Sequence, residues 1–107
     1  MYATIRRYEL KNLSKPAEAF SGLKQRLEQK FVHTLQNIRG FHGYYVLTSN
    51  DRELVTISIF EDRTGVQEST RRAAEFVKSD PLKDNLASPD VTEGELLLSK
   101  EAMVGAH

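Results

Sequence analysis

The stretch that decides the fold is Leu54-Val55-Thr56-Ile57-Ser58-Ile59-Phe60, which has the composition of a β-strand. Side chains of a strand alternate between the two faces of its sheet. One face carries Val55, Ile57 and Ile59, and the other carries Leu54, Thr56, Ser58 and Phe60. An antiparallel strand that is covered on one face should alternate apolar with polar residues. Both faces carry apolar residues here, so we expect both to be buried.

A second strand and a long helix precede this stretch. Residues 44–48 are strand formers and residues 49–52 have the composition of a turn, which predicts a hairpin. Upstream, the spacing of apolar residues predicts one amphipathic helix that starts near the N-cap Ser14, has Pro16 in its first turn and ends before Gly40. Its stripe, spaced by 3, 4, 4, 4 and 3 residues, is Phe20, Leu23, Leu27, Phe31, Leu35 and Ile38.

The remaining elements complete a β-α-β-β-α-β order. A first strand is expected over residues 2–10, and a second helix runs from its cap Asp62 to residue 79, before Pro81. Its expected inward stripe is Val66, Thr70, Ala73, Ala74 and Val77. A last strand is expected over residues 91–98, and residues 99–107 form a tail that is loose or exchanged. The order predicts an α+β fold of ferredoxin-like type, with two helices on one face of an antiparallel sheet, as a single domain over residues 1–98.

The uncovered face of this sheet predicts self-association. Two helices cover one face only, so the apolar residues of the other face need a second sheet, which an identical chain supplies most simply as a two-fold dimer. The alternative is that the third strand is central and merely apolar.

Composition excludes several classes of partner. The chain has 107 residues, with 15 basic and 15 acidic side chains, so its net charge is zero. This balance argues against binding to nucleic acid or to an anionic membrane. There is no cysteine, and no apolar run is long enough for a membrane span or a signal peptide. We therefore expect a cytoplasmic protein.

A loop and its flanking strands resemble a known family. Ile38-Arg39-Gly40-Phe41-His42-Gly43-Tyr44, followed by a hairpin that ends in Ile59-Phe60-Glu61-Asp62, resembles the antibiotic biosynthesis monooxygenase domain of the dimeric α+β barrel superfamily. The resemblance covers roughly residues 2–98 and is nearest to uncharacterised bacterial members. It implies face-to-face dimers with a pocket in each subunit between the sheet and its own helices. Some members oxygenate polycyclic aromatic compounds without metal or flavin, and others degrade haem.

The chain departs from the haem-degrading members. The resemblance implies an Asn in the first strand, a Trp at the end of the third strand and a His in or after the second helix. Arg6 and Phe60 occupy the first two positions, and no His occurs between His42 and His107. The sequence therefore argues against haem degradation.

The expected pocket lies on the helix-facing side of the sheet. By alternation and by the resemblance, Arg6, Tyr8, Ser58 and Phe60 point toward the helices, and the small side chains of Thr56 and Ser58 leave room for a cavity. As catalytic candidates, Arg6 would hold an enolate, phenolate or carboxylate, and Tyr8 would donate a proton or orient a hydroxyl. The alternative pairs Arg6 with a nearby Glu and leaves Tyr8 as ordinary packing.

Three further side chains are candidates for the pocket. Tyr44 and Tyr45 are adjacent, so one faces the pocket and the other the dimer interface, and the sequence does not say which. Arg71 would meet an anionic ligand at the pocket edge, or else lie on a solvated helix face. The sequence has no nucleotide-binding glycine motif and no His spacing typical of a metal site, so we expect neither cofactor nor metal.

These observations leave three functions open. The first is a cofactor-independent monooxygenase, an oxidoreductase acting on an electron-rich aromatic or enolisable compound. The second is a non-catalytic or stress-associated dimer that binds a small hydrophobic or aromatic molecule. The third is an assembly module whose pocket is filled by its own side chains.

Overall fold

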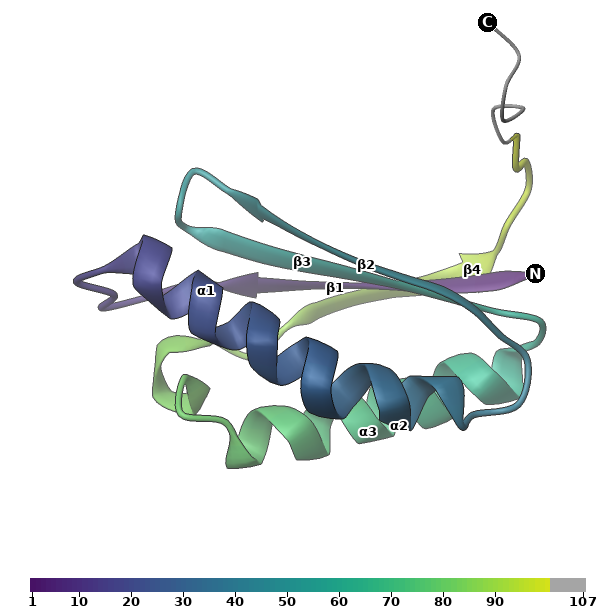
Figure 1. Cartoon of the computed structure of the whole chain (residues 1–107). Coiled ribbons are helices and arrows are strands. Elements are labelled where there is room, and N and C mark those ends of the chain that lie inside the picture. The colour runs from purple at the N-terminus through teal and green to yellow at the C-terminus, as the bar shows by residue number, and fades with distance from the viewer. Residues whose placement is uncertain (101–107) are drawn as a thin grey trace, which may run out of the picture.

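The fold is a four-stranded antiparallel sheet covered by helices on one face. A computed structural model describes residues 1–100, and the strand order is β2-β3-β1-β4 (Figure 1). The order of elements along the chain is β1 (Tyr2–Glu9), α1 (Pro16–Arg26), η1 (Leu27–Phe31), α2 (Val32–Gln36), β2 (Phe41–Ser49), β3 (Glu53–Phe60), α3 (Arg63–Ser79), η2 (Lys83–Asn85) and β4 (Asp90–Glu95). The ferredoxin-like α+β prediction is confirmed. None of the helices in residues 1–100 has the length and apolarity needed to cross a membrane.

The first long helix is interrupted by a wider turn. Residues 27–31 form the π-helical turn η1 between α1 and α2. Side chains spaced by four residues drift around an α-helix, which has 3.6 residues per turn, and a π turn takes up this drift. Leu27, Phe31 and Leu35 consequently all lie in the core. The predicted cap is wrong by one residue, because Lys15 precedes the helix, without a side-chain hydrogen bond, and Pro16 begins it.

The second helix, α3, begins where the sequence predicts. The carboxylate of Asp62 accepts a hydrogen bond of 3.1 Å from the Gly65 N–H. Gly65 lies directly against the buried ring of Phe60, and a Cβ built on it would lie 2.6 Å from Phe60 Cδ1. Of the predicted stripe, Val66 and Ala73 are buried, whereas Ala74 is exposed. The close approach of Gly65 to Phe60 therefore fixes how tightly α3 packs on the end of β3.

The last strand is shorter than predicted. Its ladder with β1 ends at the Tyr2–Glu95 pair, and the last backbone hydrogen bond runs from the Leu96 N–H to the Met1 carbonyl, 2.8 Å. Leu97 and Leu98 have no strand beside them and are 99% and 84% exposed, where the chain turns away from the sheet (Figure 1). Most of the predicted tail, residues 101–107, lies outside the described residues.

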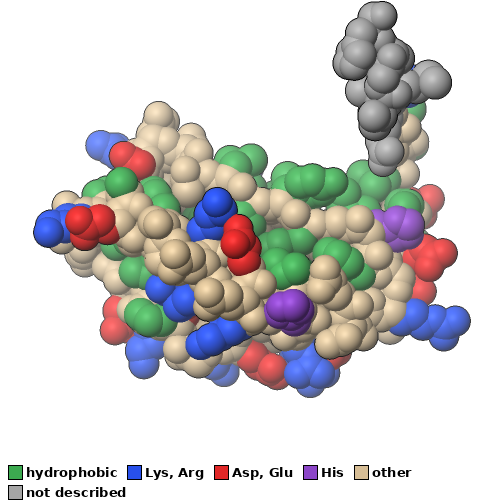
Figure 2. All heavy atoms as spheres, in the orientation of Figure 1, with side chains coloured by type: hydrophobic (Ala, Val, Ile, Leu, Met, Phe, Trp, Pro, Cys, Tyr) green, Lys and Arg blue, Asp and Glu red, His purple; other side chains and the backbone are tan. Residues whose placement is uncertain are grey.

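The two faces of the sheet differ in what covers them. The helix-facing side carries the buried β1 residues Thr4, Arg6 and Tyr8. Within residues 1–100 no layer covers the opposite side, and Figure 2 shows hydrophobic side chains along it, on the side of the sheet away from the helices. Tyr45 and Leu47 on β2 are 58% and 48% exposed there. The apolar face of β3, formed by Val55, Ile57 and Ile59, also lies on this side, and the sequence predicts that it is buried.

Candidate functional site

The centre of the candidate site is the guanidinium of Arg6. Arg6 lies in the middle of β1, opposite Thr56 of β3 and Val91 of β4, and is 1% exposed. Its Nη2 donates to Ser69 Oγ at 2.9 Å and to Thr70 Oγ1 at 3.1 Å, both on α3. Its Nη1 donates to Ser58 Oγ over a longer distance of 3.5 Å. The side chain therefore spans from the sheet to the first turns of α3.

This buried cation is held by hydroxyl groups alone. No carboxylate of residues 1–100 lies within ion-pair distance of it, which contradicts the alternative that Arg6 pairs with a Glu. Within the same residues, Arg6 Nε and the hydroxyl oxygens of Thr4 and Thr56 are buried without a hydrogen-bond partner. Buried polar groups are nearly always partnered, so three orphans on neighbouring strands indicate a place for a polar ligand or water.

Burial also sets the protonation of the neighbouring phenols. Loss of solvation lowers the pKa of Arg6, whereas Tyr8, Tyr44 and Glu93 act in the opposite direction. Burial raises the pKa of Tyr8 and, more strongly, that of Tyr44, although the charge of Arg6 offsets part of each rise. Both phenols therefore remain protonated at neutral pH and offer O–H donors close to the guanidinium.

The space directly between the sheet and the helices is nearly filled. It holds about 20 Å³ and is bordered by Arg6, Tyr8 and Thr56 on the sheet and by Leu27 and Phe31 on the helix. That is room for about one water molecule. An open central cavity is therefore a wrong prediction for the chain by itself. Phe60 packs in the core against Gly65 and Phe41, away from this space.

A larger hollow reaches Arg6 and Tyr8 from the β4 side. It has a volume of about 220 Å³ and lies between α3 and the segment that leads into β4. Apart from Arg6, Tyr8 and Thr70, its lining is small or apolar and comprises Ala73, Ala74, Val77, Leu86, Ala87, Ser88, Pro89 and Val91. We call it the Arg6 hollow. Open space therefore adjoins the Arg6 side chain, although that side chain is itself almost fully buried.

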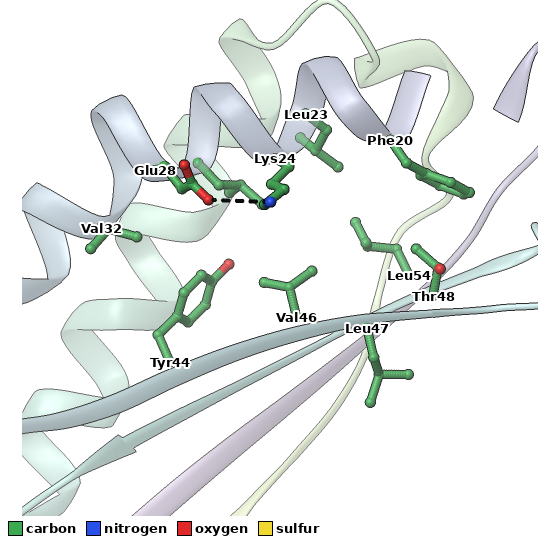
Figure 3. A pocket seen from close by; sticks show the side chains of 11 residues that line it. Phe20, Leu23, Lys24, Glu28, Val32, Tyr44, Val46, Leu47, Thr48 and Leu54 are labelled. Atoms are coloured by element: carbon green, nitrogen blue, oxygen red, sulfur yellow. Dashed lines mark ion pairs between the residues drawn. The ribbon is translucent and has the colours of Figure 1, made fainter. Parts of the chain in front are cut away.

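A second hollow of about 480 Å³ lies between α1 and the edge strand β2 (Figure 3). Tyr44 and Val46 point into it, whereas Leu47 points to the other side of the strand. An ion pair between Lys24 Nζ and Glu28 Oε1, 3.8 Å, crosses its helix side. Tyr44 thus occupies the helix-facing side, which resolves the choice that the sequence left open, and Tyr45 lies on the uncovered side.

Arg71 does not reach the site. Its guanidinium makes hydrogen bonds of 2.6 to 3.2 Å to Glu68 one turn earlier, and its side chain is 61% exposed. The solvated helix face is therefore the correct interpretation. His33 and His42 are exposed as well, and residues 1–100 contain no cluster of three His, Asp or Glu side chains placed to hold a metal ion.

Of the three hydroxyl groups that bond to Arg6, sequence reasoning missed Ser69. Ser69 is fully buried, and its hydroxyl donates to the Val66 carbonyl at 2.7 Å while it accepts from Arg6. A Ser within a polar helix sequence gives no sign of this role. Thr4 and Glu93 could have been found, because alternation places both on the Arg6 side of their strands.

A haem does not fit the residues at this site. A haem-binding pocket needs an axial ligand such as His, Cys, Met or Tyr and space for a flat macrocycle. The central space holds about 20 Å³ and the Arg6 hollow about 220 Å³, so neither has room for the macrocycle, and Tyr8 is the one residue of 1–100 lining both that could serve as an axial ligand. These observations agree with the loss of the haem-degrading residues from the sequence.

The sequence matches no protein-family model and no curated protein. Several solved structures are similar over nearly the whole chain, and three of them show the range of proteins that share this fold. A variant of SnoaB, a cofactor-independent oxygenase from Streptomyces nogalater, has a TM-score of 0.62 at 13% identity and covers 92% of this chain and 94% of its own. MhuD, a haem degrader from Mycobacterium tuberculosis, has a TM-score of 0.65 at 18% identity over 94% of this chain and 100% of its own.

The third is a protein from Nitrosomonas europaea assigned to the antibiotic biosynthesis monooxygenases. Its TM-score is 0.65 at 18% identity, and the match covers 92% of this chain and 100% of that one. Similarity at this level of identity concerns the fold, and fold does not carry function. The resemblance seen in the sequence is therefore confirmed as a shared architecture: this chain has the ferredoxin-like α+β fold of the antibiotic biosynthesis monooxygenase-like proteins.

Proposed function

We propose that this chain binds a small molecule whose anionic oxygen rests on Arg6. The observation that carries the proposal is a guanidinium that is 1% exposed, has no carboxylate partner within residues 1–100 and keeps an unpartnered Nε. An unpaired buried charge is costly, and an oxyanion that accepts charge-assisted hydrogen bonds removes that cost. The adjoining hollow of about 220 Å³ supplies the space.

The lining of the Arg6 hollow indicates the body of the ligand. Ala73, Val77 and Leu86 give it apolar walls, and Tyr8 places a phenol beside the charge. Ligand sites for drug-sized molecules usually measure about 300–1,000 Å³, so this hollow suits a smaller compound. A hydroxylated or carboxylated aromatic ring combines the apolar body with the oxyanion.

We propose further that two copies associate through the uncovered face of the sheet. Tyr45, Leu47, Ile57 and Ile59 form the centre of this face, which we call the open face. Large exposed apolar patches on a folded domain mark interaction surfaces. Two-fold pairing of this face with itself covers both copies at once.

Oxygenation without a bound cofactor is the catalytic form of this proposal. Two protonated phenols beside a buried guanidinium favour it, because they would stabilise an enolate or phenolate through hydrogen bonds. The ionised substrate would pass electrons to O₂, so that one CH₂ group becomes C=O and the second oxygen atom leaves as water. Arg6 and Tyr8 would hold the oxyanion while this occurs.

The near-filled central space favours a competing function as an assembly module. The space between the sheet and the helices, about 20 Å³, has no room for a ligand. In this function Arg6 only links β1 to α3 through its hydrogen bonds. The two functions differ in whether anything enters the Arg6 hollow.

Replacement of Arg6 by Ala separates these functions. The variant should abolish oxygen uptake with an oxidisable hydroxyaromatic substrate if the chain is an oxygenase, and should weaken binding roughly ten- to a hundredfold if it only binds. Arg71→Ala, which removes an exposed arginine, serves as the matched control. Unchanged affinity and turnover in Arg6→Ala would remove Arg6 from the site, whereas no binding and no turnover in either the unaltered chain or the variant would favour the assembly module.

A further inference from the structure

The hydrogen bonds around Arg6 leave its guanidinium with a free donor and no acceptor. Ser69 Oγ and Thr70 Oγ1 both donate to the Val66 carbonyl, at 2.7 and 3.2 Å, and so meet Arg6 only as acceptors. The hydroxyl protons of Ser69 and Thr70 are therefore already used in hydrogen bonds to Val66. Arg6 Nε–H remains free to donate, and a guanidinium has no lone pair with which to accept.

Three hydroxyl groups on the sheet lie beside Arg6, and each can donate a hydrogen bond as well as accept one. Thr56 lies directly opposite Arg6 on β3, and Thr4 lies opposite Ser58. Residues paired in this way have Cβ atoms about 4.5–5.5 Å apart, so the four side chains form one cluster. Neither Thr4 Oγ1 nor Thr56 Oγ1 has a partner, and Ser58 is used only as an acceptor from Arg6.

No side chain at this cluster is suited to remove a proton. The central space and the Arg6 hollow are lined by no Asp, Glu or His of residues 1–100. The two phenols nearby, Tyr8 and Tyr44, hold their protons more firmly than usual. Glu93 of β4 shares the helix-facing side and acts on Arg6 through its charge, but it is exposed and lines neither space.

We infer that this site accepts its ligand as an anion that ionises by itself, so the ligands are compact ring compounds bearing an intrinsically acidic group. Carboxylic acids, phenols with electron-withdrawing substituents and 1,3-dicarbonyl compounds belong to this class, and simple phenols do not. The inference rests on the proposed function, because it describes what the Arg6 site selects. It follows that binding is coupled to loss of the ligand's proton to solvent.

A coloured acid tests this inference directly. 4-Nitrophenol has a single ring, and its phenol and phenolate forms absorb at different wavelengths. Titrated with base in the presence of the full-length protein, the bound probe should show a pKa at least about one unit lower than the free probe, which is a tenfold preference for the phenolate. 4-Nitroanisole has nearly the same shape and cannot ionise, so it should bind at least about tenfold more weakly.

Variants of Arg6 and Glu93 test which side chains cause the pKa shift of bound 4-nitrophenol. Arg6→Met should remove the pKa shift of the probe, whereas Arg6→Lys, which keeps the charge and some of the donors, should retain part of it. Glu93→Gln removes the nearby negative charge and should keep or deepen the shift. Loss of the shift in Glu93→Gln would show that Glu93 accepts the proton and would overturn the inference.

Two results distinguish failure of this inference from failure of the proposed function. Binding of 4-nitrophenol with an unchanged or raised pKa would overturn the inference alone, because the site would then take the neutral form. Binding of neither probe at any pH would overturn the proposed function and the inference together.

Discussion

Neither face of this sheet follows the pattern of an ordinary half-buried sheet. The covered face buries polar groups, with Thr4, Arg6 and Ser58 each no more than 1% exposed. The uncovered face presents apolar side chains, of which Tyr45 is 58% exposed. An antiparallel sheet normally places apolar residues inside and polar residues outside. On the proposed function, the difference teaches that neither face is complete in the isolated chain: the covered face would take up an anion and the uncovered face another apolar surface.

The largest effect is expected from a substitution that disrupts pairing of the uncovered face. Ile57→Asp places a carboxylate in the middle of the open face, where a second sheet would have to desolvate it. We expect the dissociation constant of the dimer to rise at least about thirtyfold, as for a central interface residue. Sedimentation velocity over a concentration series measures this. Gln67→Asp, on the exposed side of α3, is the control and should leave the assembly unchanged.

A wild-type chain that remains monomeric at every concentration would contradict the pairing of open faces. So would an Ile57→Asp variant that dimerises as well as Gln67→Asp.

Packing on the covered face can be disrupted where Gly65 of α3 meets Phe60 of β3. In Gly65→Ala the new methyl group would lie 2.6 Å from the ring of Phe60, which is fully buried and has no room to move. Overpacking of this kind should lower the free energy of unfolding by about 1–3 kcal/mol, measured by urea denaturation. Gly94→Ala is the matched control, because nothing lies within 4 Å of its new Cβ, and its effect should stay within about 0.5 kcal/mol. Equal stability of the two variants would show that Gly65 is not a packing constraint.

The wall of the Arg6 hollow depends on Asp80. Its carboxylate accepts from Arg26 Nε at 2.7 Å and Nη2 at 3.1 Å, and from the Leu82 N–H at 3.0 Å. Asp80→Asn removes the charge and should lower the free energy of unfolding by about 1–2 kcal/mol.

Hydrogen exchange of residues 82–89 should rise in Asp80→Asn, because this segment borders the hollow and Asp80 anchors its start. Lys24→Gln is the control, since its ion pair with Glu28 is exposed and contributes little. Unchanged exchange in Asp80→Asn would show that the wall holds without this contact.

The smallest effect on stability is expected from a substitution of Arg6, which separates the role of this residue in binding from its role in folding. Arg6→Met replaces a buried, unpaired charge with an apolar chain of similar length, while Ser69 and Thr70 keep their bonds to Val66. We expect the variant to be up to about 1 kcal/mol more stable and to lose anion binding. Thermal denaturation without ligand measures the gain. A loss of several kcal/mol would mean that Arg6 serves the packing of α3 instead.

Much of the fold could be predicted because alternation and spacing are local properties. Parity along the first strand correctly separates Arg6 and Tyr8 from Arg7 and Glu9. The choice between Tyr44 and Tyr45 could not be made in the same way, because both are amphipathic and both faces of the sheet accept an aromatic ring.

The details of the candidate site depend on contacts between distant segments. Ser69 meets Arg6 across 63 positions of the sequence, and a Ser in a polar helix is ordinarily exposed. The filling of the central space depends on how Leu27 and Phe31 pack together, which apolar spacing does not determine. The sequence therefore predicted which side chains of the first strand face the helices, but not where along that side the space lies.

The wide helical turn η1 bears on how the length of this chain can change. A π turn holds about one residue more than an α turn. Deletion of the exposed Lys30 would turn η1 into an ordinary α turn and leave Phe31 and Leu35 close to their present direction relative to Leu23. Deletion of a residue within the regular helix α1 would instead rotate everything before it by about 100° relative to the rest of the core stripe. Relatives should therefore carry either this π turn or a regular helix that is one residue shorter between Leu23 and Leu35.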